Sequence, residues 1–188
     1  MMPAASSDTD EATMAALQRG EDLALNRLMT RWERPLRAFL YRSTHNEHDA
    51  LDLAQETFVR IYQHRARYRP GARFSTWMFQ IALNLARDHA RRQRRRPTTT
   101  LEEAPEPTTR VTPGQQLTDA EAAEAVRDAV AALPEDLREA VLLFEFENLS
   151  HAEIAEIVDA TPKAVETRLY RAREKLRTAL ARHLGSAR

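Results

Sequence analysis

The segment PTTTLEEAPEPTTRVTPGQQLT, residues 97–118, separates two long stretches of helix-like sequence. It holds four of the nine prolines and one of the four glycines in the 188-residue chain, and it has no apolar periodicity. This composition is typical of an extended, flexible linker. The sequence therefore predicts an all-α protein with two small helical domains, at residues 11–96 and 119–184, joined by a flexible, acidic, proline-rich linker. Residues 1–10 are expected to be disordered.

Composition limits the function as well as the fold. The chain has no cysteine, which excludes disulfides and thiolate metal sites, and with four glycines it contains no glycine-rich phosphate-binding loop. No apolar run approaches the roughly eighteen residues of a membrane span. The first residues also lack the basic and apolar regions of a signal peptide. We therefore expect a cytoplasmic protein without membrane insertion.

Helical periodicity places four helices in each domain. In the first domain they are expected at 11–19, 22–43, 49–65 and from a cap at Ser75 or Thr76 to about 95, with Pro35 kinking or interrupting the second helix. In the second domain they are expected at 119–132, 135–147, 150–158 and 162–183.

Charge is strongly segregated although the formal net charge is zero. Residues 60–96 hold eleven arginines and one acid, and residues 163–188 hold eight basic residues and two acids, whereas the intervening sequence is acidic. A single basic block is often only a solvated helix face. Two such blocks on amphipathic helices favour nucleic-acid binding.

The C-terminal domain carries the signals of a helix-turn-helix. Ser150 and Glu153 form an S-x-x-E capping box, and Thr161 precedes a proline at the first position of the next helix. Only residues 158–160 separate the two helices, which predicts a tight turn. DNA-binding units of this kind insert the first turns of the second helix into the major groove. The side chains expected on this reading helix are Lys163, Glu166, Thr167, Arg168, Tyr170, Arg171 and Arg173.

The N-terminal domain carries two polar helix faces. The acidic and polar stripe comprises Asp49, Asp52, Gln55 and Glu56, at helical spacing. On the following helix, one face carries Asn84, Arg87, Arg91 and Arg95. Arg92, Arg94 and Arg96 add charge, enough for several phosphate contacts. An uncharged Asn84 beside arginines suits hydrogen bonding to an exposed base.

Three sequence segments in this domain resemble region 2 of bacterial RNA polymerase sigma factors. They are DALDLAQETF (49–58), FSTWMFQIALN (74–84) and D-x-x-R-R (88–92). The segments LP (133–134), LSHAEIA (149–155) and VETRLYRARE (165–174) resemble region 4 of the same proteins. The similarity is to the compact extracytoplasmic-function (ECF) group.

This resemblance implies a non-catalytic function without cofactor or metal: binding of core RNA polymerase, promoter recognition at the −35 and −10 elements, and help with promoter melting. It assigns binding of the polymerase beta-prime clamp helices to Asp49, Asp52, Gln55, Glu56 and Phe58. It assigns the −10 element to Arg69, Arg73, Ser75, Thr76, Asn84, Arg87, Arg91 and Arg92. It assigns the −35 element and the beta flap to region 4. The resemblance also implies restraint by a separate anti-sigma factor and a monomer when the protein is free of partners.

Several alternatives remain open at this stage. Trp77 matches a family tryptophan, but its spacing with Ile81 favours the core over a base wedge. Glu166 stands where many relatives carry a basic residue, and it could accept from a cytosine or only complement the helix dipole. An ordinary, dimeric helix-turn-helix regulator would explain residues 119–184 equally well but not the N-terminal motifs. The cluster at 45–49 lacks a regular i, i+4 histidine pair, which argues against a metal site.

Overall fold

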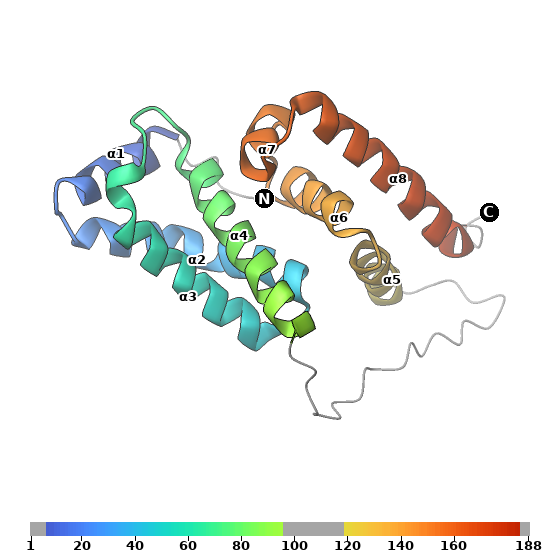
Figure 1. Ribbon diagram of the computed structural model, residues 1–188. Coiled ribbons are helices and arrows are strands. Elements are labelled where there is room, and N and C mark those ends of the chain that lie inside the picture. Colours follow the sequence, from blue (N-terminus) through green and yellow to red (C-terminus); the bar gives the residue numbers. More distant parts are fainter. Residues whose placement is uncertain (1–6, 96–118, 185–188) are drawn as a thin grey trace.

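The described part of the chain, residues 7–95 and 119–184 of a computed structural model, is helical and contains no strand (Figure 1). The expected linker at 97–118 and residues 1–6 lie outside the described residues. The first domain contains α1 (Ser7–Gln18), α2 (Leu23–Thr44), α3 (Glu47–Gln63), a short 3-10 turn (Arg65–Arg67) and α4 (Phe74–Arg95). The second contains α5 (Asp119–Ala131), α6 (Glu135–Val141), α7 (His151–Val158) and α8 (Pro162–Leu184).

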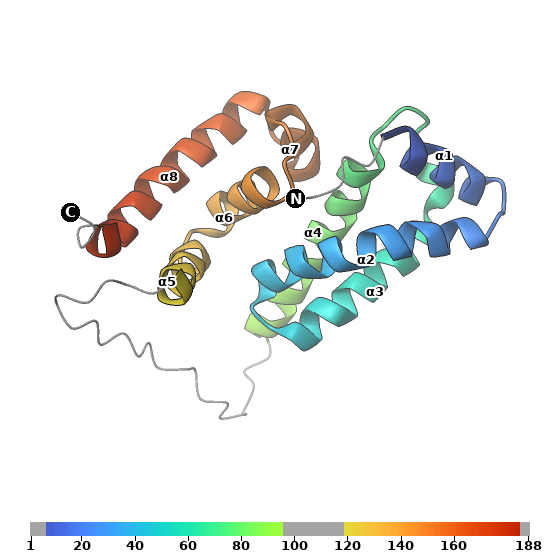
Figure 2. The same cartoon turned by 180° about the vertical axis from the view of Figure 1, so that it is seen from behind.

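An aromatic cluster forms the core of the first domain. Helices α2 and α3 lie side by side in both views, and α4 packs across them (Figures 1 and 2). Phe79 of α4 lies with its ring centroid 5.0 Å from that of Phe39 and 6.1 Å from that of Trp32, both on α2. All three side chains are buried. These contacts fix the orientation of α4 and therefore of its basic face.

Of the two effects that the sequence predicts for Pro35, a kink or an interruption of α2, the interruption does not occur. The helix continues from Leu23 to Thr44 with Pro35 inside it. Proline removes one backbone hydrogen bond. The buried side chains of Trp32, Leu36 and Phe39 on both sides of it hold the helix against the rest of the domain.

Helix α1 begins at Ser7, which is earlier than the predicted start at residue 11 and falls within the segment expected to be disordered. The reason is a buried anchor at Asp10, which is only 4% exposed. Its carboxylate forms an ion pair with Arg31 and accepts a hydrogen bond of 3.1 Å from the indole of Trp32. Both partners lie on α2, so only the folded chain brings them together.

The helix-turn-helix forms as its capping signals predict. Ser150 and Glu153 make both hydrogen bonds of the capping box, and the backbone N–H of Ala164 donates to Thr161 Oγ1 at 3.2 Å. Asp159 adopts a left-handed conformation (φ 52°) in the turn. The helix expected at 135–147 differs in detail: α6 ends at Val141 and continues as a wider π-type turn, Leu142–Phe146.

The two domains pack against each other, which the sequence did not predict. Helix α4 of the first domain lies beside α7 of the second, and the C-terminal end of α2 contacts the π-type turn. Figure 2 shows the same arrangement from behind. The helices of the described residues include none with the length and hydrophobicity that a membrane span needs.

Candidate nucleic-acid interface

Helix α8 presents one exposed polar face after the helix-turn-helix turn. Val165, Leu169 and Ala172 are buried against the rest of the domain, which turns the opposite face of the helix outward. Tyr170 is 65% exposed. Arg171 is also exposed, and it forms no ion pair with any of the described residues. The exposed side chains of the predicted set are Lys163, Glu166, Thr167, Tyr170, Arg171 and Arg173.

Glu166 is held as a carboxylate on this face. Lys163 Nζ lies 2.9 Å from Glu166 Oε2, and this hydrogen bond, with the charge of Lys163, lowers the pKa of Glu166. An ionised carboxylate can accept a hydrogen bond from a cytosine amino group and disfavours a nearby phosphate. The chemistry of a base contact is therefore available at this position.

Arg168 and Arg173 are less free than the sequence suggested. Arg168 is half-buried and lies 3.9 Å from a carboxylate oxygen of Asp136. Arg173 lies 3.2 Å from a carboxylate oxygen of Glu145, and its guanidinium lies 5.5 Å from the ring centroid of Phe144. Both arginines thus contact other elements of their own domain.

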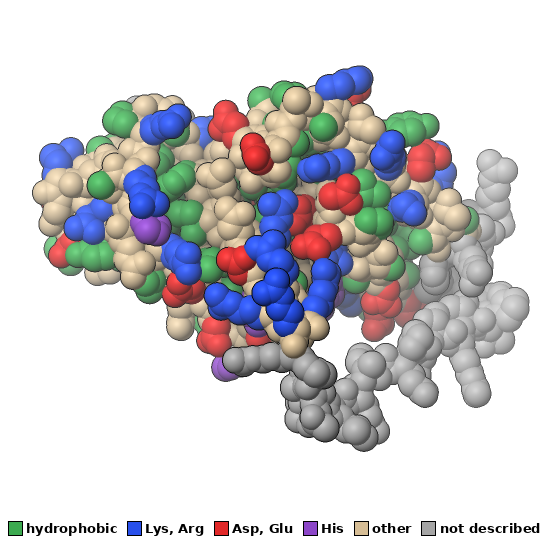
Figure 3. All heavy atoms as spheres, viewed as in Figure 1, with side chains coloured by type: hydrophobic (Ala, Val, Ile, Leu, Met, Phe, Trp, Pro, Cys, Tyr) green, Lys and Arg blue, Asp and Glu red, His purple; other side chains and the backbone are tan. Residues whose placement is uncertain are grey.

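The C-terminal end of α4 forms a basic surface. Figure 3 shows arginine side chains gathered there, with acidic side chains beside them. Asn84, Arg91 and Arg92 are exposed, and Arg91 pairs with Asp88 on the same helix. Arg69 is exposed in the loop before α4. These side chains can reach a nucleic acid without any change in their own helix.

Other residues expected at the −10 site are not available in this way. Thr76 is a correction: it is only 7% exposed and faces the core, because it shares the buried side of α4 with Phe79. Ser75 is half-buried. Arg73 pairs with Glu153, and Arg87 with Glu139, both acids of the second domain.

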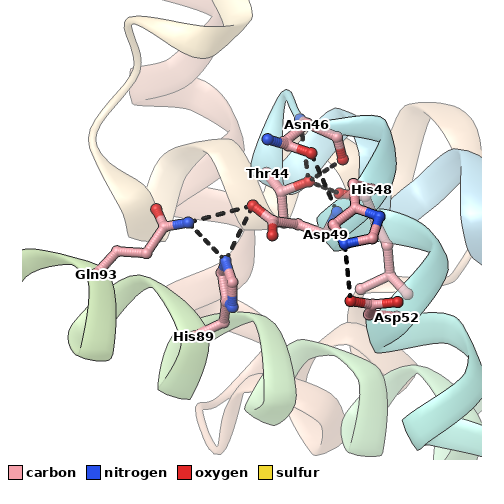
Figure 4. Close-up of polar contacts among 8 residues, drawn as sticks. Thr44, Asn46, His48, Asp49, Asp52, His89 and Gln93 are labelled. Carbon is pink, nitrogen blue, oxygen red and sulfur yellow. Dashed lines mark hydrogen bonds and ion pairs between the residues drawn. The ribbon is translucent and has the colours of Figure 1, made fainter. Parts of the chain in front are cut away.

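The acidic stripe of α3 is divided between surface and interior. Figure 4 shows Asp49 turned toward α4, where its Oδ2 atom lies 3.1 Å from His89 Nε2 and 3.2 Å from Gln93 Nε2. Asp52 is exposed, with His48 Nε2 at 3.5 Å from its carboxylate. Asp49 therefore links two helices of the domain, whereas Asp52 faces outward.

Gln55 and Glu56 of the stripe, and Phe58 that follows it on α3, also differ in their exposure to solvent. Gln55 is exposed, and Glu56 is half-exposed and lies 2.8 Å from Arg60 Nε. Phe58 is a second correction, since it is 3% exposed and packs in the core. A buried phenyl ring cannot contact a partner directly, so any effect of Phe58 on polymerase binding must act through the position of α3.

Sequence reasoning missed Glu11 of α1. Its Oε1 atom accepts a hydrogen bond of 3.3 Å from the backbone N–H of Phe74, at the first residue of α4. An acid at a helix N-terminus is favourable because of the free backbone donors there. No sequence pattern links residues so far apart. Within the described ranges, no group of three or more His, Asp or Glu side chains could hold a metal ion.

Glu147, directly after the π-type turn, is a buried acid where the two domains meet. Its side chain is 4% exposed and lies 3.5 Å from Arg42 Nη1 of α2. Arg42 also lies 4.3 Å from the ring centroid of Phe146. Burial raises the pKa of Glu147 to about 7, and the charge of Arg42 offsets this only in part.

Replacing Glu147 with glutamine is expected to stabilise the protein increasingly as the pH rises. The folded state holds the proton of Glu147 more tightly than the unfolded state, whose pKa is near 4.5. Protonation of Glu147 therefore stabilises the folded wild type fully below the unfolded-state pKa of 4.5. This contribution to the free energy of unfolding is lost as the pH rises through about 7. Urea unfolding between about pH 5 and about pH 8, followed by circular dichroism, measures the difference. A constant difference between the two proteins, or the same trend in the exposed-site control Glu145→Gln, would contradict the assignment.

In comparisons with known proteins, the two domains match two regions of the same protein family. Residues 28–96 match the family described as Sigma-70 region 2, and residues 123–176 match that described as Sigma-70, region 4. The chain is 33% identical over 177 residues to the ECF RNA polymerase sigma-E factor of Haemophilus influenzae, covering 89% of this chain and 93% of that protein. It is 33% identical over 187 residues to the RNA polymerase sigma-H factor of Pseudomonas aeruginosa, covering 92% and 94%.

Two solved structures share the fold. CnrH, in complex with the cytosolic domain of CnrY, is 27% identical with a TM-score of 0.71, covering 92% of this chain and 97% of CnrH. RpoE of Bartonella quintana, in complex with the anti-sigma factor NepR, is 22% identical with a TM-score of 0.66, covering 83% and 96%.

A helix-turn-helix domain joined to a basic helical bundle, each matching its own sigma region, defines a transcription initiation factor. The chain belongs to the ECF sigma factors of bacterial RNA polymerase. It is thus an alternative sigma factor, the component that binds core polymerase and directs it to promoters.

Proposed function

We propose that three surfaces of this chain divide the work of a sigma factor. The exposed face of α8 reads the −35 element, the basic end of α4 with the loop before it engages the −10 element, and the outward part of the α3 stripe binds the beta-prime clamp helices. The observation that carries this proposal is the free reading face of α8 behind a capped, tight turn. The domain limits are proposed as 11–96 and 119–184, and residues 7–10 extend the first helix.

At the −35 element, the first turns of α8 enter the major groove. Arg171 is free to grip a guanine with two hydrogen bonds, and Glu166 can accept from a cytosine. Tyr170 adds a large exposed ring between these charged groups. Region 4 also contacts the beta flap of the polymerase.

At the −10 element, α4 supports melting by binding bases that have left the stack. Asn84 carries both a donor and an acceptor for an unpaired base. The exposed Arg69, Arg91 and Arg92 hold the phosphates around it. Extracting a base costs a few kcal/mol, which contacts in the complex must offset.

The protein itself performs no catalysis in this proposal, because the polymerase supplies the chemistry. It acts in the cytoplasm, where the chromosome and polymerase lie, and it is a monomer when free. An anti-sigma factor holds it inactive. This part of the proposal is supported by the complexes of the similar CnrH with the cytosolic domain of CnrY and of the similar RpoE with the anti-sigma factor NepR. None of these roles requires a cofactor.

The Arg171→Ala variant is expected to weaken binding to a −35 duplex by about 1–3 kcal/mol, because it removes one bidentate base contact. Transcription from genomic promoter fragments with core polymerase first identifies a dependent promoter. Titration of its −35 fragment, by fluorescence anisotropy, then compares wild type and variant. The control Arg37→Ala removes the same charge from an exposed position on α2. Unchanged −35 binding and transcription in Arg171→Ala would contradict the reading face.

A further inference from the structure

Four side chains spaced seven residues apart join α4 to the second domain. They are Arg73, which directly precedes α4, and Gln80, Arg87 and Arg94 within it, and the spacing places them on one side of the helix. Each contacts a different residue of the second domain, within α6 or α7. The partners, in the same order, are Glu153, the backbone oxygen of Glu156, Glu139 and Glu135.

The pair between Arg87 and Glu139 is the best-formed contact of this stripe. Arg87 Nε donates to Glu139 Oε1 at 2.7 Å, and Arg87 Nη2 donates to Oε2 at 2.6 Å. The side chain of Glu139 is 8% exposed and that of Arg87 is 26% exposed. A bidentate arginine–carboxylate pair is the same geometry that arginine uses for phosphate. The carboxylate of Glu139 therefore occupies the position in which a phosphate would satisfy Arg87.

The outer contacts extend this pairing along the helix. Arg94 Nη2 lies 3.4 Å from Glu135 Oε2, and Gln80 Nε2 donates to the Glu156 oxygen at 3.2 Å. Residues 60–96 are strongly basic and residues 137–162 are acidic, with six acids and one arginine, so the charges of the two segments are complementary. The pairing takes up Arg73 and Arg87, the two arginines of this stripe that the family resemblance assigns to the −10 element.

We infer that the acidic face of α6 and α7 competes with nucleic acid for the arginine stripe of α4, so that the free protein closes over part of its own promoter-binding surface. This inference rests on the proposed −10 role of α4. In the closed form, Arg73 and Arg87 are satisfied by carboxylates of the same chain, while Asn84 remains exposed. Binding of the −10 strand then requires the two domains to separate. The contacts are ionic and partly exposed, so salt favours separation.

The distance between two labels tests the closed form directly. The chain has no cysteine, so Val59→Cys on α3, 46% exposed, and Lys175→Cys on α8, also exposed, provide two unique label sites. Spin labels at these two sites report the distance between the domains by double electron–electron resonance spectroscopy. The variant Glu135→Gln/Glu139→Gln removes two carboxylates without removing any proposed DNA contact. The matched control Glu145→Gln removes one carboxylate whose partner, Arg173, lies within the second domain.

We expect the double variant to move the labels to longer distances, and the control to leave them unchanged. Raising the salt from about 0.05 M to about 0.5 M should lengthen the wild-type distance in the same direction. Circular dichroism and the melting temperature confirm that the variant is folded. If the folded double variant keeps the wild-type distance distribution, the closed form does not depend on these pairs and the inference is wrong.

Affinity for a single-stranded −10 oligonucleotide tests the competition. Apparent affinity scales with the fraction of molecules in the binding-competent form, so the double variant should bind about fivefold more tightly or better. Longer label distances without any gain in affinity would overturn the competition. If neither protein binds the oligonucleotide, the proposed −10 role fails, and the competition fails with it, whereas the distances still decide whether these pairs close the domains.

Discussion

Replacing Asp52 with lysine is expected to lower the affinity for core RNA polymerase by about tenfold or more, since like charges brought together at an interface cost several kcal/mol. Asp52 is the outward acid of the α3 stripe, with a 61% exposed side chain that lies near His48. Its reversal therefore changes the surface without disturbing the core. Competition with a labelled wild-type protein for a limiting amount of core polymerase measures the change.

The control Asp22→Lys changes the net charge equally at the opposite end of the bundle. Asp22 is exposed and its side chain caps nothing at the start of α2. A specific clamp contact predicts a loss for Asp52→Lys alone. Equal losses in both variants would indicate a general electrostatic effect, and no loss in either would remove the α3 stripe from the polymerase interface.

Replacing Phe79 with alanine is expected to reduce the free energy of unfolding of the first domain by about 3–5 kcal/mol. Phe79 is 1% exposed and lies between Trp32 and Phe39, so its removal leaves a cavity that rigid neighbouring rings cannot fill. Domains are commonly stable by only about 5–15 kcal/mol. Both tryptophans of the chain lie in this domain, so their fluorescence during urea unfolding reports on it alone.

Leu23→Ala is the matched control for this experiment. Leu23 is 73% exposed at the start of α2, and its loss should change the free energy of unfolding by no more than about 0.5 kcal/mol. A small effect of Phe79→Ala, comparable with that of Leu23→Ala, would contradict the central position of Phe79 in the core.

The helices and the helix-turn-helix were predictable because their signals are local. Ser150 bonds to a residue three positions away, and Thr161 caps the helix that begins beside it. Val165, Leu169 and Ala172, which recur at helical spacing, likewise form the buried side of α8. Such interactions form wherever the chain adopts a helix, so they can be read without knowledge of the fold.

The assignment of single residues to a binding site was less accurate than the prediction of the helices. Phe58 and Thr76 lie within family motifs, yet both face the core. A motif records that a residue type belongs at a position without distinguishing a contact from a support. At Asp10 the error is the opposite one, since a residue expected to be disordered is buried. The sequence at 1–10 resembles a disordered terminus, and the partners of Asp10 on α2 lie about twenty positions further along the chain.

The sequence by itself determined the helical class, the division into two domains, the capped turn and the sites where basic charge is concentrated, since each depends on residues within a few turns of one another. Only the tertiary structure decided which charges are free. Arg87 and Glu139 are 52 positions apart, and Arg73 and Glu153 are 80 apart. Their pairing depends on how α4 meets α6 and α7. That contact requires two folded domains to approach each other, and no local pattern encodes it.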